Sequence, residues 1–69
     1  MSAMPVVESP TLRVNGEMWT LDEHRMEARP NNRPHDAVKV TPEIMGRLKA
    51  WAHEKMEVTY QSGTFRRKS

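Results

Sequence analysis

With 69 residues, the chain has room for one small domain, because short chains bury a low fraction of the surface that they expose when unfolded. The absence of cysteine excludes disulfide bonds and thiolate metal sites and fits a reducing compartment, so we expect a cytoplasmic protein. Eleven Lys and Arg residues against nine Asp and Glu residues give a net charge of +2, which permits a nucleic-acid partner without indicating one.

The apolar stretches are too short to cross a bilayer, and the N-terminus lacks the pattern of a signal peptide. We therefore expect neither a membrane span nor export. A single small core supplies only about 3 to 5 kcal/mol of stability. Because disulfides cannot add to it, we expect a homodimer that buries further apolar surface.

Residues 1–10 carry two prolines without periodicity and predict a flexible arm. The β-hairpin predicted over residues 11–20 turns at Asn15-Gly16, since this dipeptide adopts the positive φ angles of a two-residue turn at low cost. In that register Leu12 lies opposite Trp19, and one face of the ribbon is apolar.

Thr20 to Glu23 reads as a helix-capping box, so a short helix is predicted over Leu21 to Ala28. Pro30 prevents its continuation, and residues 30–36 are predicted to be a linker rich in proline and asparagine.

The main helix is predicted to begin at Pro42, after a brief strand from Val38 to Val40, with Thr41 as N-cap. Its apolar residues recur at helical spacing and form one stripe. The end of the helix is open between two possibilities. Either the helix continues to Gln61, which the Met56–Tyr60 spacing slightly favours, or it stops at residue 57 and the chain forms a second hairpin about Ser62-Gly63.

The predicted fold class is therefore α+β: a short N-terminal β-hairpin plus one main amphipathic helix, in a dimer. The single domain covers residues 11–65, with the main helix over 42–57 or to 61, and residues 66–69 form a basic tail.

Catalytic, cofactor and metal sites are not indicated by any motif. The one-turn spacing of His53 and Glu57 would suit two metal ligands on a helix, but a third ligand is missing. A nucleophile beside a base and a phosphate-binding glycine loop are also missing. We expect a protein without enzymatic activity, cofactor or small-molecule substrate.

The apolar helix stripe is the predicted surface for a protein partner, since Met adapts to irregular surfaces and Trp is frequent at interface hot spots. Whether Trp51 belongs to a dimer seam or to a partner site is left open. The predicted partner-binding residues are Trp51, Met45, Leu48, Met56, Tyr60 and Trp19. The predicted basic contacts are Lys39, Arg66, Arg67 and Lys68.

Residues 37–52, with Val38-Lys39-Val40, Thr41-Pro42-Glu43 and an amphipathic helix, resemble the first half of a ribbon-helix-helix repressor. The resemblance implies a strand that pairs with its dimer mate and presents Lys39 to DNA bases.

In size, methionine content and lack of catalytic motifs, the chain is also similar to bacteriophage accessory proteins that inhibit host regulators by direct binding. The first hypothesis is thus a regulatory protein that binds and inhibits another protein, for example a host transcription regulator. The alternative is a dimeric DNA-binding transcriptional regulator.

Overall fold

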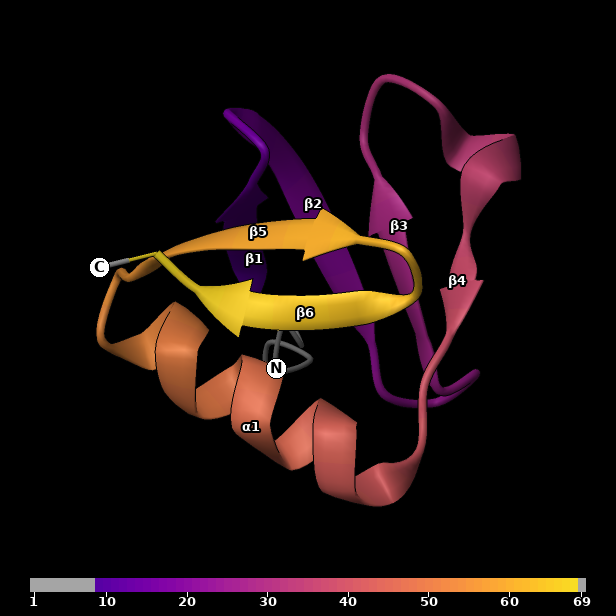
Figure 1. Ribbon diagram of the computed structural model, residues 1–69. Helices are drawn as coiled ribbons and strands as arrows, with labels where there is room; N and C mark the ends of the chain where they lie inside the picture. Colours follow the sequence, from indigo (N-terminus) through magenta and orange to yellow (C-terminus); the bar gives the residue numbers. More distant parts are fainter. Residues whose placement is uncertain (1–8, 69) are drawn as a thin grey trace, which may run out of the picture.

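A curled six-stranded sheet, wrapped about one face of a helix, forms the protein (Figure 1). The computed structural model describes residues 9–68. The strands are β1 (Thr11–Val14), β2 (Glu17–Asp22), β3 (Glu27–Pro30), β4 (Val38–Lys39), β5 (Glu57–Gln61) and β6 (Thr64–Arg67). The helices are the 3-10 turn η1 (Pro34–Asp36) and α1 (Pro42–His53). The strand order β4-β3-β2-β1-β5-β6 makes a half-barrel with α1 on its inner side.

The predicted fold class is wrong, because strands and not one main helix make up most of the regular structure. The N-terminal hairpin is only the centre of a larger sheet, which β3 and β4 extend on one side and β5 and β6 on the other. In a two-stranded hairpin both strands are edges with unpaired outward backbone groups, and such a hairpin is only marginally stable. Segments that we expected to be a helix, a linker and a tail supply the missing strands.

The first hairpin has the predicted register, with Leu12 opposite Trp19. Asn15 and Gly16 both have positive φ, at 52° and 77°, as a two-residue turn requires. Leu12, Val14 and Trp19 are buried on the inner face, while Met18 on the outer face is 39% exposed.

The helix predicted over Leu21 to Ala28 is not formed. β2 continues to Asp22, and Leu21 pairs with Ala28 across an antiparallel register that buries both side chains. The chain reverses after Asp22, whose carboxylate accepts a hydrogen bond of 3.0 Å from the backbone N–H of Arg25, and Met26 has a left-handed φ of 53°. Asp22 therefore starts a turn, and the ladder with β3 outweighs the weak helical stripe.

The start of the main helix is as predicted. The Thr41 hydroxyl accepts a hydrogen bond of 3.2 Å from the Ile44 N–H, and Pro42 occupies the first helical position. β4 pairs with β3 of the same chain, in place of the pairing with a dimer mate that the ribbon-helix-helix resemblance implies. A β-hairpin follows α1, where that family has a second helix.

The predicted continuation of the helix to Gln61 is wrong, and the open alternative of a second hairpin is observed. α1 ends at His53, Lys55 takes a left-handed φ of 58°, and β5 pairs with β6 about Ser62 and Gly63. β-branched residues at 58 and 59 favour the strand, and Tyr60 packs across from Phe65 instead of one turn after Met56. Arg66 and Arg67, expected in a tail, belong to β6.

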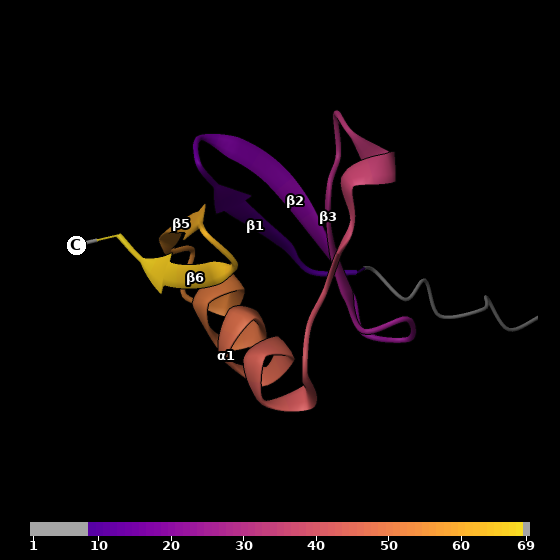
Figure 2. The same ribbon diagram turned by 45° about the vertical axis from the view of Figure 1, so that its right-hand side comes forward.

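The core lies between the inner face of the sheet and α1, which packs against β1 and β2 (Figure 2). Trp19, Tyr60 and Phe65 form an aromatic cluster within it, with ring centroids 4.4 to 5.9 Å apart. The buried apolar residues are Leu12, Val14, Trp19, Leu21, Ala28, Met45, Leu48, Val58 and Phe65. The sheet thus covers much of the apolar stripe for which we expected a second copy of the chain.

The side chain of Asn15 links β5 to the first hairpin by hydrogen bonds. β1 and β5 are parallel but pair only through Arg13–Glu57 and Val14–Val58. Beyond them the Asn15 side chain replaces a peptide group: its amide N–H donates to the Tyr60 carbonyl (3.0 Å) and its oxygen accepts from the Tyr60 N–H (3.1 Å). Asn15 therefore forms part of the turn of the first hairpin and also binds the backbone of the second hairpin.

Asn15→Ala is expected to lower the free energy of unfolding by about 2 kcal/mol, because it places a Cβ residue without a compensating side chain at positive φ and removes both bonds. Asn15→Gly keeps the favourable φ and should lose only about half as much. Urea unfolding followed by tryptophan fluorescence measures both values. If both variants are as stable as the parent, the two hydrogen bonds do not hold β5.

Candidate functional site

The basic residues fall into two groups according to their ion pairs. Within residues 9–68, six of them form salt bridges with carboxylates: Arg25, Arg29, Arg33, Lys39, Arg47 and Lys49. For the other five, the described part of the chain supplies no salt-bridge partner: Arg13, Lys55, Arg66, Arg67 and Lys68. We call this second group the basic end.

The strand register gathers the basic end around the start of β5. Arg13 is the parallel partner of Glu57, and the backbone N–H of Lys68 donates to the Glu57 carbonyl (2.8 Å). Arg67 lies opposite Val58, Arg66 lies opposite Thr59, and Lys55 is two residues before Glu57. All five basic residues are exposed. A surface with five positive charges therefore forms from segments that are up to 55 residues apart in the sequence.

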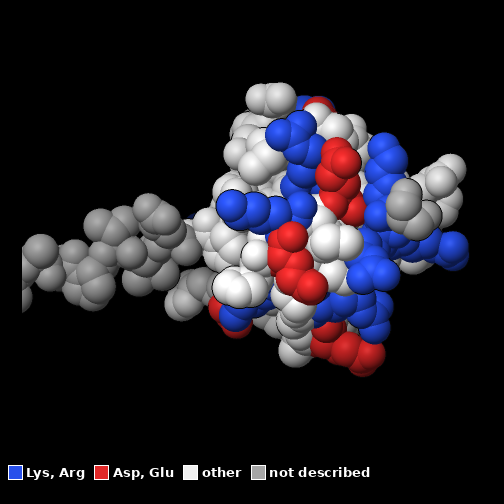
Figure 3. All heavy atoms as spheres, turned by 90° about the vertical axis from the view of Figure 1, so that its left-hand side faces the viewer, with Lys and Arg blue, Asp and Glu red and all other residues white. Residues whose placement is uncertain are grey.

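Figure 3 views the protein from the side on which β5 begins and α1 ends. Lys and Arg atoms gather on this face, and acidic side chains lie between some of them. Two acidic residues lie near the basic end in the sequence: Glu54 is the C-cap of α1, and Glu57 is the first residue of β5. They offset part of the charge, and the basic end keeps a local excess of positive charge.

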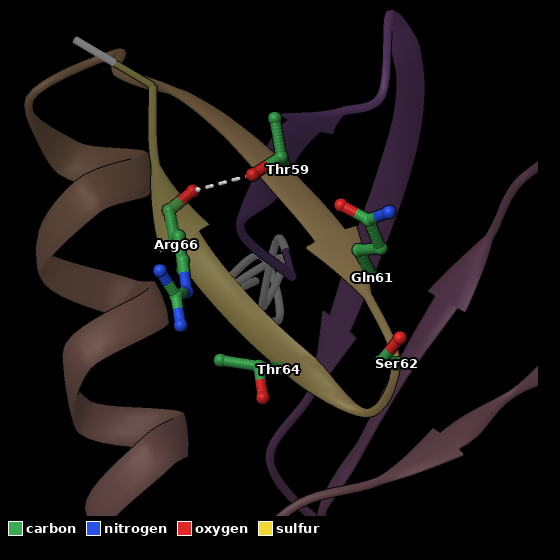
Figure 4. Close-up of a pocket in the computed structure, with 5 residues that line it drawn as sticks. All are labelled: Thr59, Gln61, Ser62, Thr64 and Arg66. Atoms are coloured by element: carbon green, nitrogen blue, oxygen red, sulfur yellow. Dashed lines mark hydrogen bonds between the residues drawn. The ribbon is translucent and has the colours of Figure 1, made fainter.

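The outer face of the β5–β6 hairpin adjoins the basic end and bears polar side chains. Its residues line a surface hollow of about 330 Å³: Thr59, Gln61, Ser62, Thr64 and Arg66 (Figure 4). The Thr59 hydroxyl donates to the Arg66 carbonyl at 3.4 Å. All five side chains end in hydrogen-bond donors, and the hollow is not lined by a carboxylate.

A second, more apolar hollow of about 380 Å³ lies between β1 and the α1–β5 connection. Its apolar lining residues are Leu12, Met18, Ala52 and Met56, and its polar and charged ones are Thr11, Arg13, Lys55 and Glu57. Met18, the large apolar side chain that is most exposed among the described residues, is part of this lining.

Comparison with models of protein families, with curated proteins and with solved structures finds no significant match for this chain.

The predicted partner-binding residues are divided by the fold. Trp19, Met45 and Leu48 lie in the core, where they are 0 to 3% exposed. Trp51, Met56 and Tyr60 are half-buried. The apolar stripe is thus mainly the contact between α1 and the sheet.

The predicted basic contacts are also divided. Arg66, Arg67 and Lys68 belong to the basic end. Lys39 lies on β4, at the opposite edge of the sheet, and pairs with Glu27 at 3.2 Å. Sequence reasoning missed Arg13 and Lys55, which no linear cluster marks. The Asn-Gly turn located β1 correctly, but only the β1–β5 pairing shows that Arg13 faces the C-terminal hairpin.

Metal-ligand geometry is not found in residues 9–68, where His, Cys, Asp and Glu side chains form no group of three or more. His53 is the last residue of α1 and Glu57 is the first of β5, so the helical spacing that would have paired them does not exist. The described helices include none that is long and apolar enough to span a bilayer.

Among the residues that the structure describes, Glu27 is the side chain with a clearly shifted pKa. The Lys39 ammonium, and then the Arg29 guanidinium at 2.7 Å, lower the pKa of this carboxyl group, and partial burial opposes them. Such a carboxylate stabilises the fold fully above its ordinary pKa, and this contribution disappears as the pH falls through the lowered pKa of the folded state.

Glu27→Gln is therefore expected to reduce stability near neutral pH, and its difference from the parent protein should shrink as the pH falls below the ordinary glutamate pKa of about 4.3 and through the lowered pKa of the folded state. Urea midpoints measured across this range give the difference. Glu43→Gln, on the exposed face of α1, is the control and should show little change. A Glu27→Gln difference that is constant with pH would contradict the role of the charged carboxylate.

Proposed function

We propose that the protein is a non-enzymatic nucleic-acid-binding protein and that the basic end is its contact surface. The observation that supports the proposal is the distribution of the basic residues over the fold. Six basic residues are paired with carboxylates elsewhere in the fold, while the five without a described partner lie together at one end of the sheet.

A chain of phosphates suits this surface. Nucleic acids present regularly spaced negative charges, and each phosphate that a Lys or Arg neutralises releases condensed counterions. Exposed basic side chains without internal partners do not have to break an ion pair to make such contacts. The neighbouring Thr, Ser and Gln side chains are further donors for phosphate oxygens.

The second candidate is the regulatory protein that binds and inhibits another protein. The apolar groove beside Met18 and Met56 supports it, since it would receive an apolar side chain of a partner whose acidic groups would contact the lining residues Arg13 and Lys55. In this form, the surface proposed to bind the protein partner is the groove instead of the apolar stripe of α1.

The test is a binding titration with fluorescently labelled DNA and RNA of mixed sequence over a series of salt concentrations. With four or five phosphate contacts, the logarithm of the affinity should fall against the logarithm of the salt concentration with a slope of about −4. Light scattering of the same samples tests the expected homodimer. Absence of binding at low salt would contradict the proposal and leave the protein-binding candidate.

A further inference from the structure

We infer that the bound nucleic acid is double-stranded and that the β5–β6 hairpin is the element that enters its major groove. This inference rests on the proposed function and specifies its ligand. It follows from which side chains the hairpin turns outward and which it turns toward the core.

The outward side chains are set by the register of the hairpin. Thr59 pairs with Arg66 and Gln61 with Thr64, and cross-strand partners lie on the same face of a sheet. On the other face, Val58 and Phe65 are buried in the core, so the first set points to solvent. Figure 4 shows these side chains on the two strands, with Ser62 in the turn between them.

This face has the chemistry needed to contact a duplex. A two-stranded ribbon fits the major groove, where arginine forms paired hydrogen bonds with guanine and glutamine does so with adenine. Arg66 and Gln61 are the residues of these types on the face, and the hydroxyl groups beside them suit backbone phosphates. Arg67 and Lys68 lie at the open end of the hairpin, where they are exposed and extend the contact with the backbone.

The aromatic residues argue against a single strand as the ligand. Proteins that bind single strands stack bases on exposed aromatic rings. Here the four aromatic residues all lie in the core or pack against it: Trp19, Trp51, Tyr60 and Phe65. The Tyr60 and Phe65 rings are on the inner face of the same hairpin, 4.4 Å apart, and the outer face offers no ring for stacking.

The first experiment compares the affinity of the full chain for a mixed-sequence DNA duplex with its affinity for each separated strand, at one ionic strength. The duplex should bind at least about tenfold more tightly. Equal or tighter binding of the single strands would overturn the inference and leave the proposed function intact. Failure to bind either form would overturn both.

The second experiment tests the hairpin face with a matched pair of amide deletions. Gln61→Ala should weaken duplex binding about fivefold or more, because it removes a side chain from the groove. Asn32→Ala removes an exposed amide near the β4 edge of the sheet and should leave binding unchanged. Thermal unfolding confirms that both variants are folded. If Gln61→Ala binds like the parent protein, the hairpin is not the reading element.

Discussion

The double variant Arg66→Gln/Arg67→Gln is expected to bind nucleic acid at least about tenfold more weakly at low salt, with a salt slope that is shallower by about 1 to 2. Both residues lie on β6, one on each face, and both are exposed without a described salt-bridge partner. Removing their charges should therefore remove the backbone contact of Arg67 and the groove contact of Arg66 without disturbing an ion pair. Titrations of labelled DNA at several salt concentrations measure affinity and slope together.

Arg25→Gln/Lys49→Gln is the matched control, because it changes the net charge by the same amount. These two residues pair with Asp22 and Glu23, away from the basic end. Exposed pairs of this kind contribute only about 0 to 1 kcal/mol to stability, so the control should remain folded. If both double variants lose affinity equally, net charge and not the basic end determines binding, and the proposal is contradicted.

Leu48→Ala is expected to unfold much of the protein at room temperature. Leu48 is completely buried, and α1 anchors the inner face of the sheet through it and Met45. Shortening a buried leucine to alanine costs about 2 to 5 kcal/mol, which is comparable with the whole stability of a domain of this size. Circular dichroism and urea unfolding should show a large loss of folded protein.

Arg47→Ala, at the preceding position of α1, is the control. Arg47 is exposed and its contact with Glu43 is 3.6 Å, so the expected change is within about 0.5 kcal/mol. The pair also separates two roles for the apolar stripe. If Leu48→Ala were as stable as the parent, Leu48 would be a partner contact and not part of the core.

The sequence predicted correctly those features that neighbouring residues decide. Asn15 and Gly16 fix a tight turn by their own φ preferences, and the turn sets the pairing of Leu12 with Trp19. Thr41 and Pro42 start α1 through a hydrogen bond and a fixed φ within one turn of chain. The predicted apolar face of the first hairpin is also the face that is buried.

The sequence predicted only part of the candidate site. Arg66, Arg67 and Lys68 are adjacent in the chain and were predicted as basic contacts. Arg13 and Lys55 are single charges within unrelated local patterns, and no spacing rule links them to the C-terminus. Lys39 was also predicted as a basic contact, but in the fold it pairs with Glu27.

The tertiary structure alone decided which ambiguous segments became strands and which charges remained unpaired. Residues 21–28 and 57–61 have weak helical patterns, but each has a neighbouring strand whose backbone groups it satisfies, and a sheet ladder forms only when that neighbour is in place. The parallel pairing of β1 with β5 then joins two ends of the sequence and assembles the basic end. Local conformational preference therefore determined the turns and the start of the helix, whereas long-range hydrogen bonding determined the sheet and the surface on which the proposed function depends.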